Sequence, residues 1–357
     1  MKDVLEAFSL RGKPVLCEPC GQGHINETYH VRTDEPHDYI VQRLNTQVFP
    51  DAEGLMRNVA AVSAHLRRKC DDPRRVVTLV PTTTGGTFYR TESGAYWRVL
   101  EFVRDGICLE QAESPEDLRQ SGVAFGGFQK QLADFPAETL TEIIPGFHDT
   151  PRRYGQLRQA VEEDRAGRLR RVKREAEEYL SREGEADGLT RLHREGSLPT
   201  RVTHNDTKLN NVMLDAETKT ALCVLDLDTV MPGLAANDFG DAIRFGANTA
   251  LEDERDLSKV SLSLPYYEAF AEGFLGACGE SLTEAELETL PLGAKLMTLE
   301  CGTRFLADYL NGDVYFHVSR DGHNLDRART QLKLVQDMER HWDEMRRIAA
   351  RAAGRTT

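Results

Sequence analysis

The segment 201–233 contains two short apolar runs, and polar residues border both of them. Residues 212–214 and 221–225 have the length and composition of strands, and the polar stretch between them has the length of a turn. The two runs therefore predict a β-hairpin. In a hairpin, the residue before the first strand and the residue after the second lie at the same end. We therefore expect the polar residues that precede 212 and follow 225 to gather there.

Carboxylate and amide side chains dominate that end of the predicted hairpin. Asp206 follows His204 by two positions, and Asn211 lies five residues further along. Asp226 directly follows the second strand. Transfer of a phosphoryl group needs one carboxylate near the acceptor hydroxyl, and oxygen ligands that hold Mg²⁺ against the phosphates of ATP. The alternative is a polar turn in which Asp206 and Asn211 only accept hydrogen bonds from the backbone.

The spacing His-x-Asp-x-Lys-x-x-Asn, followed after about 15 residues by an aspartate behind an apolar run, resembles the catalytic and metal-binding loops of the protein-kinase-like fold. Asn205 stands where protein kinases carry arginine, and the segment that binds a polypeptide substrate is absent. Both features favour the small-molecule branch, the aminoglycoside- and choline-kinase-like phosphotransferases. Asp238–Phe239–Gly240 lies 32 residues after Asp206, too far to be the metal loop. The resemblance implies that Asp238 braces the catalytic loop.

The chain divides near Asp105–Gly106 into a β-rich part and a helical part. One amphipathic segment at 51–69 predicts a helix in the first part, and Ser114, followed by proline and two acids, predicts a helix start in the second. We expect an α+β protein with a bilobal, protein-kinase-like fold: a small β-rich N-lobe at 1–105 and a larger, mainly helical C-lobe at 106–357. Strands are expected at 15–20, 27–32, 39–44, 76–80, 87–90 and 96–103, and a final helical stripe from Leu325 to Met345.

The β-rich lobe carries the expected nucleotide side of the site. Gly21 and Gly23 lie between two predicted strands, as in a loop that covers phosphates, although such glycines also occur in ordinary hairpins. This fold is expected to carry a lysine on the third strand, and the sequence has Gln42 and then Arg43 instead. Lys208, inside the catalytic loop, is a second source of positive charge for the γ-phosphate.

Residues 97–103 end the β-rich lobe and form the expected connection between the lobes. The backbone of such a connection meets the adenine ring, so we expect Glu101 and Val103 beside the base. The alternative is a buried strand without a nucleotide contact. ATP and Mg²⁺ are the expected cofactors.

Nine longer segments carry a more specific resemblance. The chain is similar to the bacterial N-acetylhexosamine 1-kinases along nearly its whole length, although much of 158–198 departs from them. Enzymes of that family move the γ-phosphate of ATP to the anomeric hydroxyl of N-acetylglucosamine or N-acetylgalactosamine. The segments are GHINETY (23–29), NTQVFPDAEGLMRNV (45–59), PTTTGGT (81–87), FHDTP (147–151), VTHNDTKLNNVMLD (202–215), LDLDTVMPG (225–233), DFGDAIRFGANTALEDERDLSKV (238–260), RFLADYLNGDVYF (304–316) and NLDRARTQLKLVQ (324–336).

The resemblance implies a role for each matching polar residue. It implies that Asp206 is the catalytic base and that Asn211 and Asp226 bind Mg²⁺, with Asp228 as a second candidate ligand. A hexosamine presents hydroxyl edges and apolar C–H faces, so its site combines polar and aromatic groups. Besides Asp206, the implied sugar contacts are His24, Phe245, Arg304 and Tyr315. The alternatives are an exposed turn histidine for His24, a surface helix charge for Arg304 and an edge-strand core aromatic for Tyr315.

The composition limits the partners of the chain. Of 357 residues, 45 are Lys or Arg and 58 are Asp or Glu, a formal net charge of −13, which disfavours nucleic-acid binding. The sequence has neither an apolar run of about 20 residues nor an export signal. We expect a cytoplasmic monomer or weak homodimer that acts on a small-molecule amino sugar. Cys17 and Cys20 are expected to be reduced thiols, with a redox dithiol as the alternative.

Two other functions are compatible with the sequence. One is a small-molecule kinase of the same fold with another acceptor, such as an aminoglycoside, choline, homoserine or a different sugar. The other is a pseudokinase that binds nucleotide without catalysis, which the absent strand lysine favours. The presence of Asp206, Asn211 and Asp226 argues against a pseudokinase. Choline would need an aromatic cage, and the only tryptophans, Trp97 and Trp342, lie far from the motif in sequence.

Overall fold

The computed structural model describes residues 1–21 and 25–355, which form two compact units. The first unit comprises residues 1–107, 134–145 and 213–232, and the second comprises residues 108–133, 146–212 and the chain from 233 onward. Strands dominate the N-terminal part of the chain, and helices dominate the C-terminal part. The predicted α+β class is therefore confirmed.

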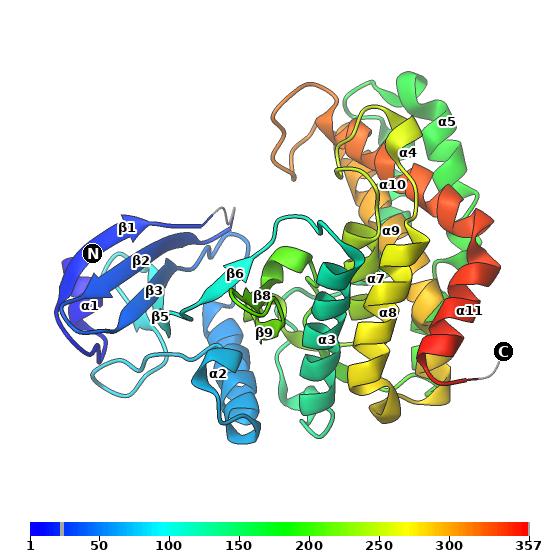
Figure 1. Cartoon of the computed structure of the whole chain (residues 1–357). Helices are drawn as coiled ribbons and strands as arrows, with labels where there is room; N and C mark the ends of the chain where they lie inside the picture. The colour runs from blue at the N-terminus through cyan, green and yellow to red at the C-terminus, as the bar shows by residue number, and fades with distance from the viewer. Residues whose placement is uncertain (22–24, 356–357) are drawn as a thin grey trace. The chain divides into compact units, whose positions relative to one another are not determined.

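The first unit contains a five-stranded antiparallel sheet in the order β1-β2-β3-β5-β4 (Figure 1). Side chains of a strand point alternately to the two faces of a sheet. Tyr39 and Val41 of the third strand therefore share one face, which packs with Val99 into the core, whereas Gln42 lies on the other face. The elements are α1 (Lys2–Glu6), β1 (Pro14–Pro19), β2 (Glu27–Thr33), β3 (Asp38–Arg43), α2 (Ala52–Lys69), β4 (Tyr89–Arg90) and β5 (Tyr96–Glu101).

Two of the predicted strands differ from the structure. Residues 76–80 form no regular strand and make a single isolated bridge, between Leu79 and Leu100. Beyond this bridge β5 pairs with β4, through Tyr89 opposite Trp97 and Arg90 opposite Tyr96, so the pairing with 76–80 does not continue. The predicted strand at 87–90 is reduced to the two residues of β4.

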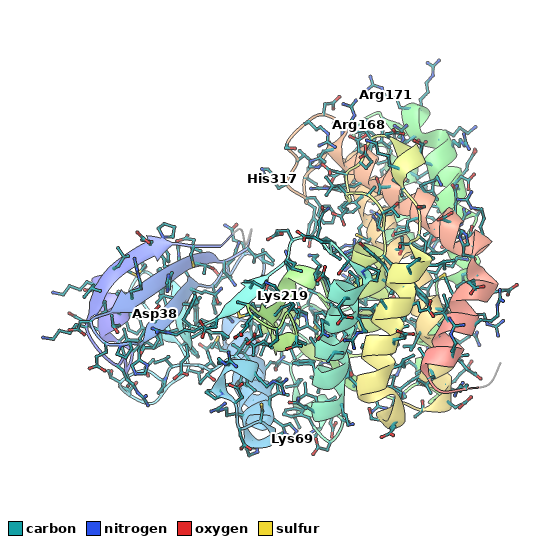
Figure 2. The ribbon with its side chains drawn as sticks, viewed as in Figure 1. Asp38, Lys69, Arg168, Arg171, Lys219 and His317 are labelled. Atoms are coloured by element: carbon teal, nitrogen blue, oxygen red, sulfur yellow. The ribbon has the colours of Figure 1, made fainter. Side chains whose placement is uncertain are left out.

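The predicted hairpin is confirmed to within one residue at each strand end. It consists of β8 (Val212–Asp215) and β9 (Ala221–Val224), and β6 (Gly106–Cys108) completes a sheet in the order β6-β8-β9. In the turn, the Asp215 carboxylate accepts the N–H groups of Glu217 at 3.1 Å and Thr218 at 3.0 Å. Lys219, labelled in Figure 2, has a left-handed φ of 57° that closes the turn.

Helices form most of the second unit, around the long helix α9, which contacts α4, α7 and α10. Ser114 caps the first of these helices as predicted, and it forms a reciprocal capping box with Asp117. No helix within the described ranges is long and apolar enough to cross a bilayer. The remaining elements are α3 (Pro115–Gln131), α4 (Thr150–Glu163), α5 (Leu169–Leu180), α6 (Gly188–Arg194), β7 (Arg201–Thr203), β10 (Met231–Gly233), α7 (Ala235–Gly246), α8 (Leu264–Cys278), α9 (Glu284–Asn311), α10 (His323–Arg340) and α11 (Trp342–Ala352).

The C-terminal apolar stripe is divided between two helices. His341, with φ −104° and ψ 17°, leaves helical geometry and separates α10 from α11. Leu325 and Met345 are both buried, so the stripe packs on its own chain as predicted. The break lets α11 contact α8 as well as α9.

The cysteines among the described residues are free thiols. Burial raises the pKa of Cys17 and of Cys20. A reactive dithiol has a lowered thiol pKa, so the structure gives no support to the redox alternative.

Glycines allow α3 and α8 to pack side by side (Figure 1). A Cβ atom on Gly273 of α8 would lie 2.1 Å from the carbonyl oxygen of Arg119 on α3. A Cβ atom on Gly276, one turn further along α8, would meet no atom within 4 Å.

We expect Gly273→Ala to lower the free energy of unfolding by about 1–3 kcal/mol, because the backbone of α3 must move away. Gly276→Ala is the matched control on the same helix, and it is expected to raise that free energy by about 0.5–1 kcal/mol. Urea denaturation of both variants and the wild type measures the difference. Equal stabilities of the two variants would contradict the close contact.

Candidate active site

The loop between β7 and β8 brings together three of the predicted residues. Lys208 Nζ lies 2.8 Å from Asp206 Oδ1. Asn211 Nδ2 donates to Asp206 Oδ2 at 3.1 Å and to the Asp206 carbonyl oxygen at 2.9 Å. The Asp206 side chain is 27% exposed, so its carboxylate is oriented by neighbours and still accessible to a substrate.

Asn211 and Asp226, the two predicted Mg²⁺ ligands, each carry side-chain oxygen atoms of the kind that a hard cation prefers. The Asn211 amide nitrogen faces Asp206, so its carbonyl oxygen is the atom that can act as a ligand. Asp226 belongs to the first unit. Its φ of 52° is left-handed, a backbone conformation that is costly for a non-glycine residue and that clusters at active and ligand-binding sites. The described part of the chain has no cluster of three His, Cys, Asp or Glu side chains able to hold a metal. Two protein oxygens with substrate phosphates are a usual donor set for Mg²⁺.

Asp238, at the first turn of α7, braces the catalytic loop as predicted. Its two carboxylate oxygens accept the backbone N–H groups of His204 at 2.9 Å and Asn205 at 2.8 Å. Gln129 Nε2 donates to the same carboxylate at 2.7 Å, and Thr207 Oγ1 donates to the Asp238 carbonyl oxygen at 2.6 Å. Asp238 is 1% exposed, and Asn205 has a left-handed φ of 64°. These contacts fix the backbone immediately before Asp206.

Asp241, one turn further along α7, supports the other side of the loop. Its carboxylate accepts the Thr207 N–H at 3.0 Å and the Arg244 Nε–H at 2.9 Å. Burial by itself raises the pKa of Asp241, but Arg244, Lys208 and other nearby cations bring it below its ordinary value. Burial lowers the pKa of Lys208, but Asp206 and Asp241 outweigh it and raise that pKa. Both groups are therefore charged at neutral pH.

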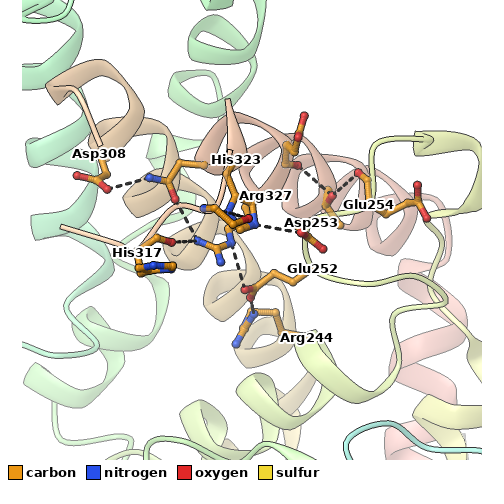
Figure 3. Close-up of polar contacts among 12 residues, drawn as sticks. Arg244, Glu252, Asp253, Glu254, Asp308, His317, His323 and Arg327 are labelled. Carbon is orange, nitrogen blue, oxygen red and sulfur yellow. Dashed lines mark hydrogen bonds and ion pairs between the residues drawn. The ribbon is translucent and has the colours of Figure 1, made fainter. Parts of the chain in front are cut away.

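Arg244 extends this contact into a polar network (Figure 3). Its side chain is 6% exposed, and its Nη1 donates to Glu252 Oε1 at 2.7 Å. The second Glu252 oxygen lies 4.0 Å from Arg327 Nε, and Arg327 Nη1 donates to Asn324 Oδ1 at 3.3 Å. The network thus connects the catalytic loop with α10.

The network continues to the loop that carries Tyr315. Asn324 Nδ2 donates to Asp308 Oδ2 at 2.9 Å (Figure 3). Asp308 accepts the backbone N–H groups of Val314 at 3.0 Å, Tyr315 at 2.9 Å and Phe316 at 3.0 Å. Tyr315 is 69% exposed. The loop is therefore held through its backbone and presents the Tyr315 ring outward.

Arg304 and Tyr315, both implied sugar contacts, lie together. The Arg304 guanidinium carbon is 5.8 Å from the centre of the Tyr315 ring, 5.7 Å from that of Phe147 and 5.3 Å from that of Phe316. A cation beside aromatic faces is attracted to them. Tyr315 belongs to no strand and is exposed, so the edge-strand alternative is wrong. The arrangement offers a polar group and aromatic surfaces side by side.

His148, next to Phe147, is buried beneath the catalytic loop. Its Nδ1 lies 3.0 Å from Glu300 Oε1, and its Nε2 lies 3.3 Å from the Asn205 carbonyl oxygen. A doubly protonated ring can donate to both. Burial lowers the pKa of His148, but the Glu300 carboxylate outweighs it and the pKa is raised above its ordinary value.

Because the pKa of His148 is raised in the folded state, the stability of the protein should depend on pH in a defined direction. The contribution of His148 to stability is fully present below its unfolded pKa of about 6.5 and is lost as the pH rises through the folded pKa. We expect the wild type to lose stability relative to His148→Gln as the pH rises from about 6 to about 9. Urea denaturation across this range measures the effect, and His317→Gln, at an exposed position, is the control. Parallel pH profiles of His148→Gln and the wild type would contradict the assignment.

Phe245, the third implied sugar contact, lines a cavity of about 590 Å³ within the second unit. Leu209 of the catalytic loop lines the same cavity, as does Gln331 of α10. Gln331 is 1% exposed, and its Oε1 has no hydrogen-bond partner within the described part of the structure. A buried acceptor without a partner costs free energy. A ligand in the cavity that donates a hydrogen bond would remove this cost.

Of the predicted nucleotide residues in the first unit, Gln42 and Glu101 belong to strands of its sheet. Gly21 follows β1 with a left-handed φ of 81°. Gln42 on β3 bonds to its neighbours on β2 and β5. Glu101 ends β5, with its N–H bonded to the Thr78 carbonyl oxygen at 2.9 Å, and Val103 follows two residues later. Gly23 and His24 lie outside the described residues.

Asp228 has neighbours that the sequence did not indicate. It is 3% exposed and forms a buried ion pair with Arg98 of β5. Its other carboxylate oxygen accepts a hydrogen bond from Asn26 Nδ2 at 2.7 Å. Both oxygens are thus engaged within the protein, which does not favour Asp228 as a metal ligand. No spacing in the sequence links Arg98 to Asp228, 130 residues further along.

A family model described as "Phosphotransferase enzyme family" matches residues 17–272. Similar solved structures include the microcompartment-associated aminopropanol kinase, 17% identical over 96% of this chain and 97% of that one, with a TM-score of 0.59. The amicoumacin kinase hAmiN, in complex with AMP-PNP, Ca²⁺ and Ami, is 14% identical over 93% and 92%, with a TM-score of 0.63. The Plasmodium vivax ethanolamine kinase is 15% identical over 88% and 82%, with a TM-score of 0.54.

At these identities the likeness concerns the fold, and it confirms the predicted protein-kinase-like fold class. The family model covers well over half of the chain and includes the loop of Asp206, its brace Asp238 and the hairpin that precedes Asp226. This chain therefore belongs to the phosphotransferase enzyme family and is a small-molecule phosphotransferase.

Proposed function

We propose that the protein is an ATP- and Mg²⁺-dependent kinase that phosphorylates the anomeric C1 hydroxyl of N-acetylhexosamines. The observation that carries the proposal of a kinase is the Asp206 carboxylate, which Lys208 and Asn211 orient in a loop that Asp238 braces. Family membership supports the reaction class. The resemblance to the N-acetylhexosamine 1-kinases and the group of Arg304 and Tyr315 support the acceptor.

In the proposed reaction, the acceptor hydroxyl donates a hydrogen bond to Asp206. The hydroxyl oxygen forms a bond to the γ-phosphorus of ATP as the bond from that phosphorus to the bridging oxygen of ADP breaks. The hydroxyl proton moves to Asp206 late in this step. Asn211 and Asp226 are the residues that would hold Mg²⁺, and the ion would supply charge neutralisation at the phosphates. Lys208 keeps Asp206 oriented and adds positive charge near the transferred group.

The charges around the Phe245 cavity favour a neutral acceptor over a cationic one. Its acidic side chains already face cations: Glu252 lies 2.7 Å from Arg244, and Glu254 lies 3.5 Å from Lys259. A polycation such as an aminoglycoside needs uncompensated carboxylates, whereas an N-acetylated sugar presents hydroxyl and amide groups. Such donors also suit the buried oxygen of Gln331.

A second candidate is an amino alcohol acceptor. Two of the similar structures are an aminopropanol kinase and an ethanolamine kinase by name. Such an acceptor is small and carries a hydroxyl group, which the same Asp206 chemistry would phosphorylate. It is cationic, and the paired acids around the cavity disfavour it.

A coupled assay of ADP release over a panel of acceptors tests both candidates. The panel contains N-acetylglucosamine, N-acetylgalactosamine, glucosamine, aminopropanol, ethanolamine, choline, homoserine and an aminoglycoside. We expect the highest kcat/KM with the two N-acetylhexosamines and a phosphorus NMR signal that locates the product phosphate at C1. A preference for the amines would contradict the acceptor, and ADP release with no member of the panel would favour the pseudokinase.

A further inference from the structure

A row of polar side chains crosses the sheet of the first unit, on the face opposite to Val41 and Val99. Thr28, Gln42 and Arg98 are paired residues of β2, β3 and β5. Directly paired residues of neighbouring antiparallel strands lie on the same face. Gln42 Nε2 donates to Thr28 Oγ1 at 3.1 Å, and Arg98 Nε donates to Gln42 Oε1 at 2.9 Å. The row ends on the guanidinium group of Arg98.

One carboxylate joins this row to two loops. Arg98 and Asp228 are each 3% exposed, and Arg98 Nη1 contacts Asp228 Oδ1. Asn26 Nδ2 donates to Asp228 Oδ2 at 2.7 Å, and the Asn26 oxygen accepts the N–H of Asn45 at 2.9 Å. Asp228 therefore connects β5, the segment after β9, and the residue that precedes β2.

These segments are the ones that would face the phosphates of ATP. Asp226, the proposed Mg²⁺ ligand, precedes Asp228 by two residues, and Asn26 ends the connection that begins at Gly21. β3 has Gln42 where this fold was expected to carry a lysine, and β5 places Arg98 directly beside it. A buried ion pair is often no more stabilising than an apolar pair of the same volume. Stability alone therefore gives little reason to place a charged pair here.

We propose that Arg98 supplies from β5 the structural positive charge that position 42 of β3 lacks, and that its pairing with Asp228 positions the phosphate side of the site. The inference rests on the proposed kinase function. Asp228 is the partner of Arg98 and not a metal ligand. Through Asp228, Arg98 fixes the loop of Asp226, and through Asn26 it fixes the start of β2. Arg98 is thus a positioning residue.

Four variants of the whole chain separate positioning from simple stabilisation: Arg98→Met, Arg98→Lys, the double variant Arg98→Met/Asp228→Leu, and Arg32→Met. Arg32 is the matched control, because it is an arginine of the same sheet, on β2, and its side chain is exposed. For each variant, thermal unfolding gives Tm. Calorimetry gives the affinity for AMP-PNP in EDTA and in Mg²⁺.

We expect Arg98→Met to leave Asp228 buried without its cation and to lower Tm by roughly 5–15 °C. The double variant removes both charges and should recover most of this loss. In it, the gain in AMP-PNP affinity that Mg²⁺ provides should still fall by about tenfold or more. Affinity in EDTA should change little. Arg98→Lys keeps the charge without the Nε–H bond to Gln42, and its gain in AMP-PNP affinity from Mg²⁺ should lie between those of the wild type and Arg98→Met. Arg32→Met should match the wild type.

A double variant with a recovered Tm and the wild-type gain from Mg²⁺ would overturn the inference, because the pair would then only stabilise the fold. If Arg32→Met also lost the Mg²⁺-dependent gain in AMP-PNP affinity, the inference would be overturned too, because removal of any arginine from the sheet would then have the same effect. A wild-type chain that binds no AMP-PNP under either condition would instead overturn the proposed function, and the inference with it.

Discussion

Asp206→Asn is expected to lower kinase turnover by about 10²–10⁴-fold, the range associated with general-base catalysis. Asparagine has nearly the same size and can keep contacts with Lys208 and Asn211, but it cannot take the proton of the acceptor hydroxyl. We therefore expect a change in kcat with little change in KM. The coupled ADP assay with N-acetylglucosamine and N-acetylgalactosamine measures both constants.

Asp256→Asn is the matched control for this substitution. Asp256 is exposed and caps the short helix at Leu257–Lys259, and asparagine caps helices as well as aspartate does. The control should keep wild-type turnover, and both variants should keep the wild-type Tm. Turnover near the wild-type value in Asp206→Asn would mean that another group accepts the proton.

The second large effect is expected for Asp238→Asn, which should lower both stability and turnover. Three donors now point at the Asp238 carboxylate: the backbone N–H groups of His204 and Asn205, and the side chain of Gln129. Asparagine has only one acceptor oxygen, and its NH₂ group would face one of these donors. A buried donor without a partner costs about 1–3 kcal/mol. The loop before Asp206 would lose its fixed geometry, so we expect a fall in kcat of about tenfold or more.

Urea denaturation and the coupled assay together test this expectation, with Asp187→Asn as the control. Asp187 belongs to the second unit, and its side chain is half exposed at 50%. If Asp238→Asn retained wild-type stability and turnover, the brace would have no energetic role. A variant that lost stability but kept full turnover would show that Asp238 supports the fold without orienting Asp206.

Much of the site could be predicted because its parts are local in sequence. The hairpin at 212–224, the polar residues 204–211 before it and Asp226 after it all lie within 33 residues. Strand periodicity and a short turn leave few ways to arrange such a segment. The brace could be predicted from the resemblance, since Asp238 follows the hairpin closely, and its hydrogen bonds in the structure agree.

Other predictions failed where distant contacts decide the outcome. Residues 76–80 have the composition of a strand but make only one bridge with β5, which pairs with β4 further along. The C-terminal stripe has the periodicity of one helix, yet His341 divides it, and no glycine or proline there signals the break. For Asp228, only the structure reveals that its carboxylate is buried and contacts Arg98 and Asn26.

The sequence alone predicted the fold class and, through its resemblance to kinase loops, the reaction class, and both are confirmed. The role of Asp206 as the catalytic base stays a prediction. Only the tertiary structure brought Arg304 beside Phe147 and Tyr315, and Arg98 beside Asp228. The members of these pairs are between 11 and 157 residues apart in the sequence. The identity of a charged or aromatic residue does not specify which distant residue it will contact. Packing selects that partner, because a buried charge must find an opposite charge or a hydrogen bond to offset the loss of water.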